Sequence, residues 1–263
     1  MTTNFSGKKI AIFGLGKSGI AAAKKLASLG ARVVVTESQG KASFAATGTA
    51  GTGTAVAANL PAEASVEAGL ALLGVEIEFG GHTLAAIEGD DLIVVSPGVH
   101  LDLPVLKEAK KRNIPIISEI ELAYQFLSKP VIAVTGTNGK TTTTTLIGEM
   151  LRAEGFRVSV AGNIGFPLAA VDDEDLDYIV AEISSYQLET IREFKPWISV
   201  ILNIQPDHLE RHHTMRKYIN QKARIFMNQQ GDDYVVYNRD DEHVREMVES
   251  ARAKRIGFSK AEA

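Results

Sequence analysis

VIAVTGTNGKTTTTT, residues 131–145, is the stretch that decides the fold of the second half of this 263-residue chain. Its apolar start predicts a buried strand, and residues 146–153 continue as a helix, so residues 136–141 should form the loop between them. Such a loop binds phosphate through its backbone N–H groups and the positive end of the following helix. Lys140 would reach the outer phosphates, and the Thr141 hydroxyl a Mg²⁺ ion. Helix propensity does not explain five consecutive threonines, because β-branched residues are mediocre helix formers.

The segment departs from the strict phosphate-loop consensus, which places a glycine where this chain has Val134. An ordinary strand, turn and helix with a solvated lysine is the other interpretation. The sequence T-G-T-N-G-K-T-T resembles the variant phosphate loop of the Mur ligases, ATP-dependent enzymes that add amino acids to the bacterial cell-wall precursor. The resemblance implies that ATP binds at Gly136, Thr137, Asn138, Gly139, Lys140, Thr141 and Thr142.

Composition and charge narrow the class of protein. A chain of 263 residues should hold two domains, each with its own core. A net charge of −4 gives no reason to expect nucleic acid as a partner. The absence of cysteine excludes disulfides and thiolate metal sites, and it fits a reducing compartment. No apolar run approaches the ~20 residues that span a bilayer, and no signal peptide is recognised. We expect a cytoplasmic monomer without membrane insertion.

The first half begins with a nucleotide-binding pattern. Residues 9–13 read as a strand, residues 14–19 as the glycine loop G-L-G-K-S-G, and residues 32–36 as a second strand after an alanine-rich helix. This is G-x-G-x-x-G in its required context, with Glu37 where a ribose-binding acid is expected. The pattern does not name the nucleotide, and glycines that serve only tight packing are the other interpretation. A nicotinamide cofactor is the main alternative ligand.

A second turn of the first half should face the same crevice. Residues 91–96 predict a buried strand that ends in Ser96-Pro97-Gly98. Ligands in open parallel sheets bind at the carboxyl ends of strands, so this turn should lie near the glycine loop. A turn used only for packing remains an alternative.

The rest of the first half indicates where a loop, a helix and the first domain begin or end, and we assign no chemical role to it. The Ala, Gly, Thr and Ser tract of residues 40–59 predicts a mobile surface loop or insertion. Ser118 to Glu121 fits a capping box that starts a helix. Lys129-Pro130 then breaks the pattern. We therefore expect domains at 1–128 and 129–263.

The second half places an acid and a histidine at strand ends. Residues 178–181 predict a buried strand that delivers Glu182 near the phosphates, where it would hold Mg²⁺; a carboxylate that caps Ser184 or Ser185 is the alternative. Residues 198–204 predict a further strand, followed by His208. The acidic residues 172–177 are assigned no role. His212 and His213 show no metal-ligand spacing and are left out.

Lys222 is the most informative single residue. It falls on a helix face that Met215, Tyr218 and Ile219 mark as apolar. Such a lysine snorkels to the surface, pairs with a buried acid, or has a lowered pKa that leaves a reactive neutral amine. The residues alone do not choose among these.

Three further segments carry the family resemblance. EISSYQLE at 182–189 is similar to the signature of the Mur ligases that add D-glutamate to UDP-N-acetylmuramoyl-L-alanine, and NIQPDHLER at 203–211 matches the family's D-H motif. K-A-R at 222–224 matches a motif whose lysine is carbamylated by CO₂. Gln39 stands where the family often has arginine. The resemblance implies catalytic residues Lys140, Glu182, His208 and Lys222, metal ligands Thr141, Glu182, His208 and Lys222, and substrate contacts at Gly14, Gly16, Lys17, Ser18, Gly19, Glu37, Ser96, Pro97, Gly98, Asn163, Ser184 and Gln187.

The fold class is therefore α/β: a Rossmann-like domain for the uridine nucleotide, then an incomplete parallel-sheet domain of the phosphate-loop ATPase type. The resemblance implies ATP, Mg²⁺, UDP-N-acetylmuramoyl-L-alanine and D-glutamate as partners, and an acyl phosphate intermediate. It also implies a third, carboxyl-terminal domain for the amino acid, which we expect to be absent, so that this fragment turns over poorly or not at all. A non-catalytic nucleotide-binding module and a NAD-dependent oxidoreductase are the alternatives.

Overall fold

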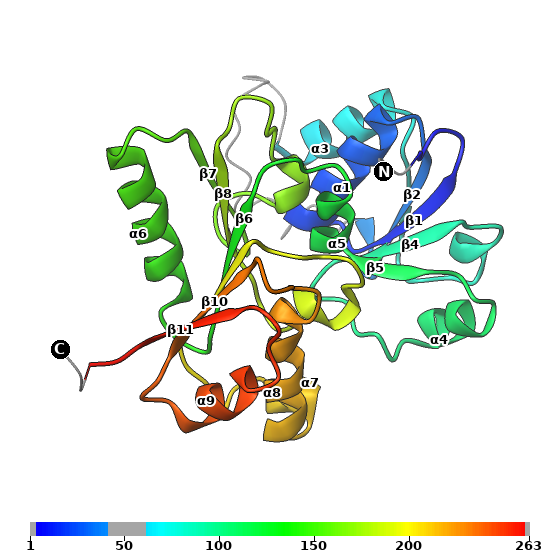
Figure 1. The fold of residues 1–263 in the computed structure, drawn as a ribbon. Helices are drawn as coiled ribbons and strands as arrows, with labels where there is room; N and C mark the ends of the chain where they lie inside the picture. Colours follow the sequence, from blue (N-terminus) through cyan, green and yellow to red (C-terminus); the bar gives the residue numbers. More distant parts are fainter. Residues whose placement is uncertain (1–3, 42–61, 261–263) are drawn as a thin grey trace. The chain divides into compact units, whose positions relative to one another are not determined.

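A computed structural model describes residues 4–41 and 62–260 of the chain (Figure 1). The chain divides into two compact units, Met1–Gln125 and Phe126–Ala263, and each is described by itself. The Ala, Gly, Thr and Ser tract, apart from residues 40 and 41, lies outside the described residues.

The first unit is built on a five-stranded parallel sheet with the order β3-β2-β1-β4-β5. This order reverses between β1 and β4, and in doubly wound sheets ligands bind outside the carboxyl ends of the strands at that switch point. The loops after β1 and β4 are the predicted glycine loop and the turn at Ser96. The elements are β1 (Lys9–Phe13), α1 (Lys17–Ser28), β2 (Arg32–Glu37), α3 (Ala62–Leu72), β3 (Glu76–Phe79), η1 (Ala85–Ile87), β4 (Leu92–Val95), α4 (Pro104–Lys111), β5 (Ile116–Ser118) and α5 (Glu119–Tyr124).

Small and β-branched side chains explain how this unit packs. Strands β1, β2 and β4 read as continuous apolar runs because both faces of a parallel sheet are covered. Helix α1 buries Ala21, Ala22 and Ala23, whose short side chains let the helix lie close to the sheet. Phe13, Ile93 and Leu106 are fully buried and belong to one cluster of the hydrophobic core.

The second unit is a six-stranded parallel sheet with the order β11-β10-β9-β6-β8-β7. Strand β6 lies between β8 and β9, so the phosphate loop that follows β6 is flanked by the loops that follow its two neighbours. All three strand ends carry residues of the predicted site. The elements are β6 (Val131–Thr135), α6 (Lys140–Ala153), β7 (Val158–Gly162), η2 (Leu168–Ala170), β8 (Tyr178–Glu182), η3 (Gln187–Thr190), β9 (Ile198–Ile201), α7 (Leu209–His212), α8 (Met215–Ala223), η4 (Arg224–Phe226), β10 (Tyr234–Asn238), α9 (Glu242–Val248) and β11 (Lys254–Phe258).

The predicted fold class, two parallel-sheet α/β domains, is confirmed. Three local expectations were wrong. Helix α6 begins at Lys140, so the connecting loop ends at Gly139 and not at residue 141 as expected, and the Thr144 hydroxyl donates to the carbonyl of Lys140 (2.8 Å). Ser118 makes no capping hydrogen bond at the start of α5. Asp173 is not an idle surface acid, because it accepts hydrogen bonds from the backbone N–H groups of Ser128 and Lys129 at the start of the unit.

Among residues 4–41 and 62–260, no helix combines the length and apolar character that crossing a membrane requires.

Candidate functional site

Two glycines shape the loop between β6 and α6. Gly139 is the residue before α6 and has a left-handed backbone, with φ of 81°, which other residues adopt only under strain. Gly136 has φ of 156°, and a Cβ there would lie 3.0 Å from Leu202. The chain can therefore turn sharply into the helix, whose first N–H groups have no partner within the helix and favour an anion.

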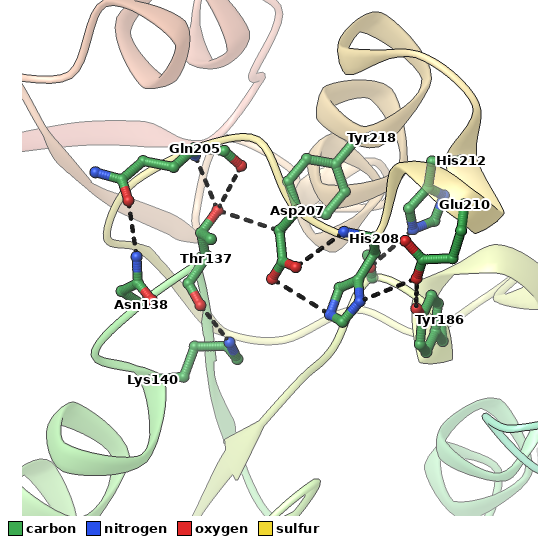
Figure 2. A network of polar contacts seen from close by, with 12 residues as sticks. Thr137, Asn138, Lys140, Tyr186, Gln205, Asp207, His208, Glu210, His212 and Tyr218 are labelled. Atoms are coloured by element: carbon green, nitrogen blue, oxygen red, sulfur yellow. Dashed lines mark hydrogen bonds and ion pairs between the residues drawn. The ribbon is translucent and has the colours of Figure 1, made fainter.

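The loop after β9 holds this phosphate loop in shape (Figure 2). The Asn203 side chain accepts from Asn138 N–H (2.8 Å) and donates to the Asn138 carbonyl (2.9 Å). The Asn138 side chain donates to Gln205 (2.9 Å), and the Thr137 N–H donates to the Asn203 carbonyl (2.9 Å). The loop is thus fixed from outside by side chains that are distant in sequence.

Lys140 is half-buried and bonds to its own loop. Its Nζ donates to the Thr137 carbonyl (2.8 Å), as Figure 2 shows. The amine is therefore tied to its own loop, unlike a lysine that is fully solvated. The ammonium is thus held at the loop, where it can neutralise a phosphate oxygen.

Thr141 and Glu182 meet at the ends of neighbouring elements. The Thr141 hydroxyl donates to Glu182 Oε2 (2.7 Å), and the Asn163 side chain donates to Glu182 Oε1 (2.8 Å). Glu182 is 1% exposed and does not cap Ser184 or Ser185, so that alternative is wrong. A hydroxyl and a carboxylate in contact fit one Mg²⁺, which proteins usually hold by one or two carboxylates together with substrate phosphates. In the described part of the chain, no three His, Asp or Glu side chains gather as a ready-made metal site.

Ser184 and Gln187 shape one turn after β8. Gln187 is buried, and its side-chain oxygen accepts from the Ser184 N–H (2.9 Å) and the Ser184 hydroxyl (3.0 Å). Gln187 therefore supports Ser184, which keeps part of its surface exposed. A ligand at this turn would meet Ser184 before Gln187.

His208 occupies a constrained position after β9. Its backbone is left-handed, with φ of 53°, which is uncommon outside glycine. Its ring nitrogens lie 3.4 Å from an Asp207 oxygen and 3.6 Å from a Glu210 oxygen, and its ring packs on Tyr186 with centroids 4.9 Å apart. The imidazole is held between two carboxylates at the edge of the site (Figure 2).

Lys222 is buried beside the phosphate loop. It is 2% exposed, so it does not snorkel, and its Nζ donates to the Gly136 carbonyl (2.8 Å) and lies 4.7 Å from the Tyr218 ring centroid. Burial lowers the pKa of Lys222 to about 7, the charge of Lys140 lowers this pKa as well, and Asp207 raises it. A substantial fraction of this amine is neutral near neutral pH.

Residues that sequence reasoning passed over complete this site. His212 is buried and its Nε2 lies 3.0 Å from the Ser185 hydroxyl; burial lowers the pKa of His212, which favours the neutral ring. Arg211 and Glu189 pair through two hydrogen bonds (3.0 and 2.6 Å) and join the loops after β8 and β9. No spacing in the sequence signals these contacts. Tyr218 had a signal, because it lies one helical turn before Lys222.

Several residues of the nucleotide site predicted in the first unit contact one another. The Ser96 hydroxyl donates to the Gly14 carbonyl (3.2 Å), so the two loops at the switch point touch. Glu37 is 9% exposed and accepts from the N–H groups of Leu15 (2.9 Å) and Gln39 (3.0 Å). Burial alone would raise the pKa of Glu37, but these hydrogen bonds lower it overall. Glu37 therefore fixes the glycine loop, a role beyond the ribose contact that the pattern predicts.

Other predicted contacts of the first unit lie around the same loop. Gly16, Lys17 and Gly98 are exposed, and Ser18 and Pro97 are half-buried. His82, which sequence reasoning missed, packs on Phe13 and lies 3.0 Å from the Thr36 hydroxyl. The exposed glycine-loop residues and this histidine surround the carboxyl ends of β1 and β2.

Both units match known protein families. The family model described as "Mur ligase MurD-like, N-terminal domain" matches residues 8–118, and that described as "Mur ligase middle domain" matches residues 134–263. The chain is 44% identical over 255 residues to the UDP-N-acetylmuramoylalanine--D-glutamate ligase of Caldanaerobacter subterraneus subsp. tengcongensis, which covers 96% of this chain and 52% of that protein. It is 43% identical over 260 residues to the ligase of the same name from Koribacter versatilis, covering 97% and 52%. The chain thus spans about half the length of the curated relatives it matches.

Solved structures share the fold. The UDP-N-acetylmuramate:L-alanyl-gamma-D-glutamyl-meso-diaminopimelate ligase from Neisseria meningitides superposes with a TM-score of 0.60 at 17% identity, covering 96% of this chain and 78% of that one. The UDP-N-acetylmuramate-alanine ligase from Thermotoga maritima gives 0.52 at 24% identity, covering 96% and 52%. At such identities the likeness shows the fold alone. The two family models, matched one after the other, and relatives that align along nearly the whole chain show that this protein belongs to the Mur ligase family.

Proposed function

We propose that the chain binds UDP-N-acetylmuramoyl-L-alanine in its first unit and ATP in its second, as the nucleotide-binding parts of a ligase that adds D-glutamate to that substrate. The observation that carries the proposal is the convergence of Lys140, the Thr141–Glu182 pair and buried Lys222 on one phosphate loop. The relatives that align along this chain bear the name of that ligase. Such a reaction would use ATP in the cytoplasm, and we expect the protein to be monomeric there.

The second unit would bind and orient the triphosphate. The loop N–H groups at Gly136 to Thr142 hold the phosphates, and Lys140 neutralises charge that develops on the transferred phosphoryl group. Thr141 and Glu182 would hold one Mg²⁺, with Asn163 fixing the Glu182 carboxylate. The ion would supply charge neutralisation between the outer phosphates.

Lys222 would act after modification. Its neutral amine can attack CO₂ and lose a proton to solvent, which gives an anionic carbamate where the protonated lysine would be a cation. In that form Lys222, with His208, would suit a second Mg²⁺; both residues already share Asp207 as a charged neighbour. An unmodified, protonated Lys222 would repel a metal ion instead.

Each unit would contribute substrate contacts of its own. Phosphoryl transfer to the L-alanine carboxylate would give an acyl phosphate, which the D-glutamate amine then attacks to form the amide and release phosphate. Asn163, Ser184 and Gln187 would lie at the muramoyl-alanine end. The uridine diphosphate end would contact Gly14, Gly16, Lys17, Ser18, Gly19, Glu37, Ser96, Pro97 and Gly98.

Calorimetric titration tests the proposal directly. The chain should bind UDP-N-acetylmuramoyl-L-alanine and Mg-ATP, and it should not bind NAD. Lys140→Ala should lose ATP and keep the uridine nucleotide, whereas Lys217→Ala, an exposed lysine of the same unit, should keep both. Binding of NAD alone would favour the oxidoreductase, and a folded chain that binds neither nucleotide would refute the proposal.

A further inference from the structure

The second unit contains a buried tyrosine for which the proposed chemistry assigns no task. Tyr218 is 1% exposed and lies in α8, four residues before Lys222. Residues four apart lie on one face of a helix. That face touches the phosphate loop at two successive residues: Lys222 Nζ bonds the Gly136 carbonyl, and the Tyr218 hydroxyl lies 3.1 Å from the Thr137 hydroxyl.

The ring of Tyr218 is held by two side chains. Lys222 Nζ lies 4.7 Å from its centroid, and the His212 ring packs against it with centroids 5.3 Å apart. An aromatic side chain has only two rotatable bonds, so a clamped ring leaves its hydroxyl in one place. The hydroxyl is therefore a rigid anchor rather than an adaptable contact.

The hydrogen bonds of Thr137 show what the anchor does. Thr137 Oγ1 accepts from the Gln205 N–H (2.9 Å) and lies 3.2 Å from the Gln205 carbonyl, to which it donates. A threonine hydroxyl has one proton and two acceptor positions. With its proton on Gln205, the second acceptor position takes the proton of Tyr218, so every hydrogen-bonding position of Thr137 is filled (Figure 2).

From this geometry we infer that Tyr218 is a positioning residue for nucleotide binding: its hydroxyl fixes Thr137 and so presets the phosphate loop for ATP. The inference rests on the proposed function of that loop. Gln205 holds Thr137 from the loop after β9, which is exposed at Gln205, whereas Tyr218 holds it from the buried side. Without the tyrosine hydroxyl, the loop would spend part of its time away from the phosphate-binding shape, and ATP would have to restore it.

The test replaces the hydroxyl and keeps the ring. In Tyr218→Phe, the clamp between Lys222 and His212 remains while the bond to Thr137 is lost. Loss of one hydrogen bond should raise the Kd for Mg-ATP by about three- to tenfold, measured by calorimetry on the full chain. Tyr178→Phe is the matched control, because Tyr178 lies at the opposite end of β8 from Glu182, and it should leave ATP affinity unchanged.

A second readout separates positioning from general destabilisation. Amide hydrogen exchange in a peptide covering residues 134–145 should accelerate in Tyr218→Phe, while exchange in β10 and β11 stays as in the wild type. In addition, Thr137→Val should weaken ATP binding, and adding Tyr218→Phe to it should cause little further loss, because both changes break the same bond.

The outcomes are distinct. If the wild-type chain binds no ATP, the proposed function and this inference both fail. If the wild type binds and Tyr218→Phe binds equally well with unchanged loop exchange, only the inference fails. If exchange accelerates throughout the unit, Tyr218 is a packing residue and the positioning role is again refuted.

Discussion

Lys222 is the residue whose surroundings differ most from those of an ordinary surface lysine. It is 2% exposed, and burial lowers its pKa from 10.5 to about 7. Between these two values the unfolded chain binds more protons than the folded one, so stability rises with pH across this range. Below pH 7 Lys222 is charged in the folded chain as well, and burying this charge lowers the free energy of unfolding by its full amount.

Replacing this lysine by an apolar residue of similar length should therefore stabilise the chain, most strongly at low pH. At about 1.4 kcal/mol per pKa unit, Lys222→Met should gain on the order of 5 kcal/mol near pH 6, less the hydrogen bond to Gly136, and this gain should shrink toward pH 10. Urea unfolding in CO₂-free buffer at several pH values measures the effect. Lys217→Met, an exposed lysine of the same helix, should show no such trend, and a gain for Lys222→Met that is constant with pH would contradict a lowered pKa.

At the scale of elements, two glycines of one loop have different tasks. A Cβ at Gly19 would collide with the Gly14 carbonyl oxygen, so Gly19 allows α1 to lie against the loop. A Cβ at Gly16 would meet no atom within 4 Å, and its φ of −77° suits any residue. Packing explains Gly19 but not Gly16, whose bare backbone leaves room for a ligand.

The two positions make a matched pair of variants. Gly19→Ala should destabilise the chain by about 2 to 3 kcal/mol, because helix or loop backbone must move. Gly16→Ala should cost less than about 1 kcal/mol and should instead weaken binding of UDP-N-acetylmuramoyl-L-alanine. Unfolding curves and calorimetric titrations distinguish the two effects. Normal affinity in Gly16→Ala would show that this glycine is not kept for a phosphate, and full stability in Gly19→Ala would rule out its packing role.

At the scale of the whole molecule, the chain consists of two units that each bury their own core. A ligand that binds only the folded state of one unit stabilises that unit, by about 2.7 kcal/mol at a hundred times its Kd. UDP-N-acetylmuramoyl-L-alanine should therefore raise the unfolding temperature of the first unit, and Mg-ATP that of the second. Scanning calorimetry with limited proteolysis, which identifies the unit that opens first, measures both. A single transition raised equally by either ligand would show that the units unfold together.

Much of this organisation follows from local sequence. The order of strands and helices is encoded by apolar runs and by glycine loops, since periodicity and backbone sterics act over a few residues. The segments at Gly14–Gly19 and at Gly136–Thr141 were therefore recognisable, and so was the unusual place of Lys222 on an apolar helix face. The same kind of local pattern was misleading at Ser118, where it suggested a helix cap that the serine hydroxyl does not make.

The sequence by itself thus determined the two α/β units, the two loops suited to phosphate and most of the side chains at the strand ends. Only the tertiary structure decided which residues support them. Asn138 and Asn203 are 65 residues apart, and Thr137 and Tyr218 are 81 apart, so their contacts exist only because β9 lies beside β6 and α8 packs under the loop. Contacts of this kind depend on strand order and helix packing, and no local pattern in the chain records them.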